Sequence, residues 1–136
     1  MAQETYFKID HTGKVSRLQI DRKDMLPEFY RALDCDSLEN VRTVLRDVCL
    51  IVDECGKIKT PAKPCNEFAS CFYMGAIAGL DYISGDAIFS AIHLVDGDPD
   101  WVPLNSVELA TVIGYLFGVG YPEQAQELKR LNGEST

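Results

Sequence analysis

The sequence predicts an α+β fold, in which a mostly antiparallel β-sheet is combined with one early helix and two C-terminal helices. Three observations indicate this class: two β-like runs joined by a short turn open the chain, β-branched runs recur at 48–52 and 81–95, and two stripes of helical spacing close it. A chain of 136 residues, 46% hydrophobic and 25% charged, has the size and composition of one globular unit. We therefore expect a single domain over residues 1–136, with residues 133–136 frayed.

The first expected elements are a hairpin and a helix. Residues 5–10 and 14–20 have β-like composition, and Gly13 in the His-Thr-Gly turn between them supplies a positive φ. Asp24 is a candidate N-cap for a helix with apolar residues at helical spacing. We expect this helix to end near Asp34.

Residues 38–46 fit two different structures. Ser37 could cap a helix there, but the same residues also alternate as they would in a strand. We prefer a strand pair hinged near Arg46-Asp47, because the following run, Val48 to Val52, is rich in β-branched residues.

The middle of the chain is expected to contain a loop, a short helix and a second strand region. Asn66 is a natural N-cap for a helix-like piece over 67–73, and the Gly/Ala-rich residues 75–79 are expected to form a connection. A Ser-Gly-Asp sequence divides 81–95 into two strand pieces or introduces a bulge. Residues 97–100 are expected to form a turn.

Two helices are expected at the C-terminal end. Asn105 is an N-cap, and Glu108 at the third helical position completes a variant of the capping box. The last helix begins with Pro122 at its first position and stops before Gly133. The expected buried stripe of the first of these helices consists of Leu109, Val112, Ile113, Leu116 and Phe117.

Charge is distributed unevenly along the chain. The net charge is −8, and residues 1–60 hold ten Lys/Arg against eleven Asp/Glu, whereas residues 61–136 hold three against ten. Because a nucleic-acid-binding protein needs clustered cations to displace counterions from phosphates, the second half argues against direct DNA or RNA binding. No apolar run approaches the roughly 18 residues of a membrane-spanning helix, and the N-terminal sequence has no signal-peptide pattern. We expect no membrane contact and a cytoplasmic location.

Neither a metal site nor a catalytic site is predicted. The five cysteines form no C-x-x-C pair, and the chain has only two histidines, His11 and His93, so we expect reduced thiols and no cofactor. The DGDPD run at 96–100 lacks the glycine and glutamate that would complete a calcium loop. His93 alternates with its apolar neighbours, which predicts that it projects from the opposite face of the strand.

The residues from Val48 to Ser70 include the local cation cluster Lys57, Lys59 and Lys63. Together with residues 81–90, this stretch forms a pattern whose positions are Leu50 to Val52, Asp53, Glu54, Gly56, Lys57, Ile58, Lys59, Pro64, Asn66, Ala69, Ile83, Gly85, Asp86, Ala87 and Ile88. At these positions the chain resembles an uncharacterised family of proteins from bacteriophages and mobile elements of Gram-positive bacteria.

The resemblance covers residues 48–90. Outside this range, the hairpin and the late helix match the family only in their general layout. The additional Pro61 and the long helical C-terminus depart from the family pattern. The family has no established activity, but its members are often encoded beside antirestriction genes. The resemblance therefore implies a role in the conflict between a mobile element and its host.

We expect a non-enzymatic binding or interaction protein of a phage or mobile element, whose partner is a host protein or a second copy of itself. The candidate binding residues are Lys57, Lys59, Lys63, Asn66, Ser70 and Asp86. Two alternatives stay open: a sponge for a small nucleotide signal, contacted by Lys57, Lys59 and Asn66, and an acidic DNA mimic that uses the cation-free half. Trp101 either packs in the core, which we favour, or anchors a partner.

Overall fold

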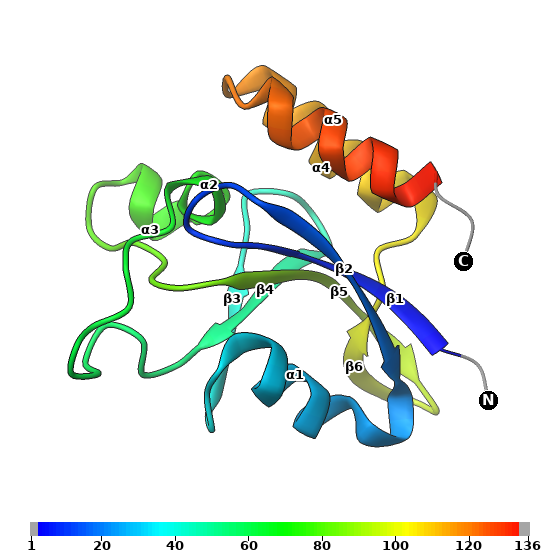
Figure 1. Cartoon of the computed structure of the whole chain (residues 1–136). Helices are drawn as coiled ribbons and strands as arrows, with labels where there is room; N and C mark the ends of the chain where they lie inside the picture. Colours follow the sequence, from blue (N-terminus) through cyan, green and yellow to red (C-terminus); the bar gives the residue numbers. More distant parts are fainter. Residues whose placement is uncertain (1–2, 134–136) are drawn as a thin grey trace.

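A computed structural model describes residues 3–133, in which six strands form one antiparallel sheet (Figure 1). The order is β2-β1-β5-β4-β3, and β6 pairs with the second half of β5. The strands are β1 (Gln3–Ile9), β2 (Val15–Asp21), β3 (Leu38–Arg42), β4 (Val48–Asp53), β5 (Ala87–Val95) and β6 (Asp98–Val102). The helices are the 3-10 turn η1 (Arg22–Asp24), α1 (Met25–Leu33), α2 (Glu67–Ser70), α3 (Met74–Ile77), α4 (Ser106–Gly118) and α5 (Pro122–Gly133).

The sheet lies between two helical layers, with α1 on one face and the pair α4–α5 on the other (Figure 1). All six residues of β4 are buried, because this strand is covered on both faces. Leu50 belongs to the core on the α4–α5 side, whereas Ile51 packs with Phe29 of α1. This arrangement confirms the α+β class and the mostly antiparallel sheet predicted from the sequence.

Several expected elements are confirmed in detail. The first two strands form a hairpin, with Gly13 at a φ of 89° in the turn. Residues 38–42 form a strand paired with β4, as we preferred. Asn66 caps α2, and Asn105 and Glu108 form the reciprocal capping box of α4.

Four local expectations were wrong. Residues 98–100 belong to strand β6, because pairing with β5 extends them in spite of Pro99. Residues 74–77 form the short helix α3 instead of a simple connection. The piece from 81 to 86 is held by loop contacts and forms only an isolated bridge at Ser84. Phe117, expected in the buried stripe, is 44% exposed.

The ends of the helices show two smaller differences. Asp24 occupies the N-cap position of α1 but makes no side-chain cap; Asp21 instead accepts a hydrogen bond from the amide of Lys23 at the preceding 3-10 turn. Helix α5 includes Gly133 as its last residue. The rest of the expected frayed tail, 134–136, lies outside the described residues. Within residues 3–133, no helix has the length and apolarity needed to cross a bilayer.

Candidate functional site

Two of the predicted binding lysines contact the same buried carboxylate. The Nζ atoms of Lys59 and Lys63 lie 2.6 Å and 3.0 Å from Oδ2 of Asp53, the last residue of β4. Lys63 also donates to the carbonyls of Leu33 and Asp34, where α1 ends, and Lys59 donates to that of Asp34. These carbonyls carry the negative end of the helix dipole, so both lysines stabilise the junction of α1 with the sheet.

Asp53 responds to this surrounding charge. Burial alone would raise the pKa of its carboxyl group, but the hydrogen bonds from Lys59, Lys63 and the Cys55 amide outweigh burial and lower it. Asp53 is therefore an anion at neutral pH and is the counterion of the Lys59 and Lys63 ammonium groups.

The other predicted binding residues also have partners within the fold. Lys57 pairs with Asp81 and lies 4.8 Å from the ring centroid of Tyr82. The Asp86 carboxylate lies 3.4 Å from Lys8 Nζ. Each of these pairs joins the 57–86 region to itself or to β1, and none leaves an ammonium group without a counterion.

Asn66 and Ser70 are structural. Asn66 is completely buried; its Nδ2 donates to the carbonyls of Ile9 (3.0 Å) and Gly85 (2.9 Å), while Oδ1 accepts from the amide of Ala69. Ser70 Oγ accepts from the amide of Ile83 at 2.8 Å. The predicted binding residues therefore lie in one region of the structure. Their ion pairs and hydrogen bonds connect the loops of this region to one another and to the sheet. The hollow beside them, lined in part by Lys57 and Asp53, measures only about 30 Å³.

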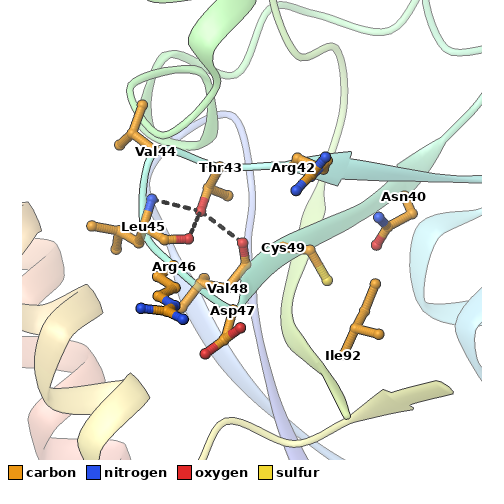
Figure 2. Close-up of a pocket in the computed structure, with 10 residues that line it drawn as sticks. All are labelled: Asn40, Arg42, Thr43, Val44, Leu45, Arg46, Asp47, Val48, Cys49 and Ile92. Atoms are coloured by element: carbon orange, nitrogen blue, oxygen red, sulfur yellow. Dashed lines mark hydrogen bonds between the residues drawn. The ribbon is translucent and has the colours of Figure 1, made fainter. Parts of the chain in front are cut away.

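A much larger cavity lies at the other end of β4. It measures about 660 Å³, and Asn40, residues 42–49 and Ile92 line it; we call it the hairpin groove. The register pairs Arg42 with Cys49, so both side chains point to the α1 face of the sheet, as do Asn40 and Ile92. Helix α1 covers this face near Ile51, and the groove lies beyond that cover (Figure 2).

Two exposed arginines line the hairpin groove. Arg42 ends β3, and Arg46 lies in the turn that leads into β4 (Figure 2). Within residues 3–133, neither guanidinium makes a hydrogen bond or an ion pair. This distinguishes them from Lys57, Lys59 and Lys63, whose ammonium groups are all paired.

The turn that carries Arg46 is held in place by its neighbours. Thr43 Oγ1 donates its single hydrogen to the carbonyl of Val48 at 2.7 Å, lies 3.1 Å from the carbonyl of Leu45 and accepts from the Leu45 amide. The amide of Val44 donates to the carbonyl of Phe72 at 2.9 Å, which anchors the turn to the segment after α2. The groove wall is therefore fixed before any ligand arrives, which lowers the entropic cost of binding.

The groove adjoins a second hollow of about 300 Å³, lined by Asn40, Ile92, Pro99, Asp100 and Trp101; we call it the Trp101 hollow. Trp101 Nε1 donates to Asn40 Oδ1 at 2.9 Å, and its ring meets Phe29 edge-on with centroids 6.0 Å apart. Trp101 is half-buried, so it both packs against the core, as we favoured, and forms a wall of the hollow.

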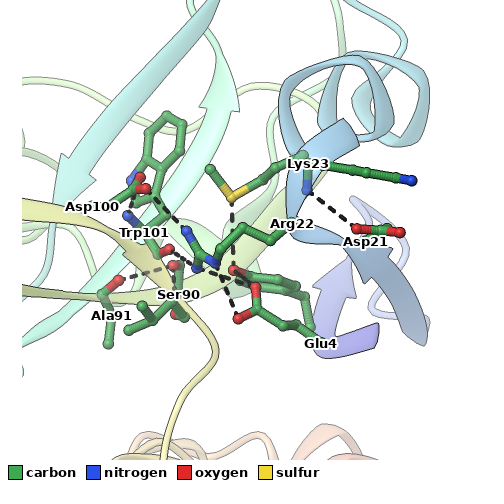
Figure 3. Close-up of polar contacts among 11 residues, drawn as sticks. Glu4, Asp21, Arg22, Lys23, Ser90, Ala91, Asp100 and Trp101 are labelled. Atoms are coloured by element: carbon green, nitrogen blue, oxygen red, sulfur yellow. Dashed lines mark hydrogen bonds and ion pairs between the residues drawn. The ribbon is translucent and has the colours of Figure 1, made fainter. Parts of the chain in front are cut away.

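Arg22 fixes the strand that carries Trp101. Its guanidinium lies between Glu4 of β1, at 3.1 Å, and Asp100 of β6, at 2.9 Å (Figure 3). It also donates to the Trp101 carbonyl. Burial alone would lower the pKa of Arg22, but hydrogen bonding and attraction to Glu4 raise it. Arg22 is therefore a permanent cation that positions the wall of the Trp101 hollow.

The hairpin groove is lined by charged, amide and apolar side chains and by one thiol. No histidine lines it, and its thiol belongs to Cys49, whose pKa burial raises to about 12. A thiol with that pKa is protonated at neutral pH and is a poor nucleophile. No cluster of three metal-ligating side chains exists among the described residues.

Comparisons with known proteins identify no relative of this chain. No family model, no curated protein and no solved structure matches it.

Sequence reasoning missed the hairpin groove because its residues come from three separate strands. The available signal was local: Arg46 lies in the predicted hinge and Arg42 four residues before it, without an acidic residue between them. Nothing in the sequence shows that Trp101, more than fifty positions later, adjoins the same surface.

Proposed function

We propose that this protein is a non-enzymatic binding protein that holds an anionic ligand in the hairpin groove, with Arg42 and Arg46 as its principal contacts. The observation that carries this proposal is the pair of guanidinium groups without partners in the described part of the chain, on the rim of a cavity of about 660 Å³. A guanidinium presents several N–H donors in a plane, which matches the oxygens of a phosphate or carboxylate.

The setting in this proposal is the host cytoplasm, where a protein of a phage or mobile element would capture a host-derived ligand. The overall charge of −8 would repel a long polyanion but has less influence on a short one held by two adjacent cations. The fixed turn around Thr43 supports binding without rearrangement of the groove.

The DNA-mimic alternative has less support. Mimicry of DNA requires carboxylates that are free to replace phosphates. In the acidic second half, Asp81 pairs with Lys57, Asp86 with Lys8 and Asp100 with Arg22. These pairs reduce the surface charge that mimicry would need.

Isothermal titration calorimetry with inorganic pyrophosphate at low salt tests the proposal. The wild-type chain should bind it, and the double variant Arg42→Gln/Arg46→Gln should bind at least about tenfold more weakly, because two charge-assisted contacts are lost. The matched control is Lys23→Gln/Lys129→Gln, which removes the same charge from exposed positions outside the groove. It should retain the wild-type affinity within about twofold.

Two outcomes would contradict the proposal: no binding by the wild-type chain, or equal loss of affinity in both double variants. Equal loss would mean that net charge, and not the groove, governs binding. Thermal unfolding of each variant checks that the fold is retained.

A further inference from the structure

The hairpin groove and the Trp101 hollow are neighbouring parts of one face of the sheet. Asn40 of β3 and Ile92 of β5 line both cavities. A ligand in the hairpin groove can therefore extend across these two side chains to Trp101 without leaving the protein surface. The two cavities, about 660 Å³ and 300 Å³, fall within the usual size range of small-molecule sites.

The two parts of this surface differ in chemistry. The hairpin groove supplies the unpaired guanidinium groups of Arg42 and Arg46. The Trp101 hollow supplies the indole ring, Ile92 (38% exposed) and Pro99, which together suit a flat apolar group. A complementary ligand would be anionic at one end and carry a ring at the other.

Two polar groups that line this surface are available to a ligand. Asn40 Oδ1 accepts from Trp101, but the Asn40 side-chain NH₂ group has no partner within residues 3–133. The Asp47 carboxylate directly follows Arg46, lines the same part of the hairpin groove and has no partner in the same range. A ligand with both hydrogen-bond acceptors and hydroxyl or amino donors would satisfy them, whereas Asp47 would repel a ligand that is anionic throughout.

We propose that the ligand is a small nucleotide, with its phosphates at Arg42 and Arg46 and its base against Trp101. Phosphate, ribose hydroxyls and base supply the anion, the donors and the ring that this surface requires. Base–aromatic contact adds affinity that a free phosphate cannot gain. This inference rests on the proposed function and narrows it to one class of ligand.

A free nucleotide fits the charge of the chain better than a nucleic-acid strand does. Each further phosphate of a strand would meet a protein with a net charge of −8, whose lysines at 57, 59 and 63 are already paired. A strand gains affinity by releasing counterions along many cations, and only two unpaired ones line this groove.

Trp101 provides a direct readout, because it is the one tryptophan of the chain. Its fluorescence would be titrated with the 5′-diphosphates of adenosine, guanosine, cytidine and uridine and with cyclic dinucleotides. Inorganic pyrophosphate serves as the ring-free control, and a single-stranded DNA oligonucleotide as the polymer control. At least one nucleotide should change the fluorescence and bind about tenfold or more tightly than pyrophosphate.

Calorimetry on Trp101→Leu separates the two ends of the site. This variant should lose the advantage of the nucleotide while its affinity for pyrophosphate stays within about threefold. If Trp101→Leu does not fold, the fluorescence titration of the wild-type chain still decides the question.

The outcomes distinguish this inference from the proposed function. If pyrophosphate binds through Arg42 and Arg46 but no nucleotide binds more tightly or alters the fluorescence, the nucleotide inference fails and the anion site stands. Tighter binding of the oligonucleotide than of every nucleotide would also overturn the inference. If neither pyrophosphate nor any nucleotide binds, both proposals fail.

Discussion

The lysines of the 57–63 loop each contact a partner that lies far away in the sequence. Lys59 and Lys63 reach Asp53 and the carboxyl end of α1, and Lys57 reaches Asp81. Clustering of charge is visible in a sequence, but pairing is visible only in the fold. Arg42 and Arg46 lie four positions apart in the sequence, and the fold leaves both unpaired within residues 3–133.

The ion pairs of Asp53 predict a specific dependence of stability on pH. Because its pKa is lower in the folded protein than the ordinary value of 3.8, the unfolded chain takes up the proton first as the pH falls. The stabilisation by Asp53 is therefore present above that value and is lost as the pH falls through the folded pKa.

Urea unfolding of the wild type and Asp53→Asn between about pH 6 and pH 2 measures this effect. The difference in the free energy of unfolding between the two proteins should be largest near pH 6 and shrink as the solution becomes more acidic. A difference that stays constant across this range would show that Asp53 does not titrate with a lowered pKa.

Replacing the buried Asn66 side chain should cause a large loss of stability. Asn66→Ala would leave the carbonyls of Ile9 and Gly85 without this donor and remove the N-cap of α2. We expect the free energy of unfolding to fall by about 3 kcal/mol in urea titrations. The exposed Asn132→Ala is the matched control and should change it by less than about 0.5 kcal/mol. A loss below about 1 kcal/mol for Asn66→Ala would refute the structural role of this side chain.

At the scale of elements, the strands depend on the turns and strand partners that fix their register. The hairpin of β1 and β2 turns at Gly13, whose backbone approaches Phe68 closely. Strand β6 exists because Asp98 to Val102 pair with β5 and because Arg22 binds Asp100 and the Trp101 carbonyl. Those tertiary contacts override the turn-like composition of this strand.

Substitutions at Gly13 and Gly79 allow the cost of backbone strain to be compared with the cost of a steric clash. Both have positive φ values, 89° and 77°, but a Cβ at Gly13 would lie 2.7 Å from Phe68 Cζ, whereas a Cβ at Gly79 would meet nothing within 4 Å. Gly79→Ala should cost about 1 kcal/mol of unfolding free energy from backbone strain alone. Gly13→Ala should cost about 3 kcal/mol, because the steric clash adds to the strain. Equal losses in chemical denaturation would show that the close approach is unimportant.

At the scale of the whole molecule, the layered α+β architecture was predictable and the binding surface was not. Periodicity identifies the hairpin, α1, α4 and α5, and the capping box identifies the start of α4, because those signals are local. Predicting the groove would require knowledge of the register that brings Arg42, Cys49 and Ile92 to one face of the sheet. It would also require knowing that α1 covers only part of that face. Both depend on tertiary packing, which one sequence does not reveal.

We propose that ligand binds at the hairpin groove and not at the lysine loop of residues 57–63. Two-dimensional ¹H–¹⁵N NMR of the wild-type chain during titration with pyrophosphate tests it most directly, because every amide reports separately. We expect the largest changes in chemical shift at residues 40–49 and Ile92, and we expect Arg42→Gln/Arg46→Gln to abolish them. Changes centred on residues 57–70, or spread evenly over the surface, would contradict it.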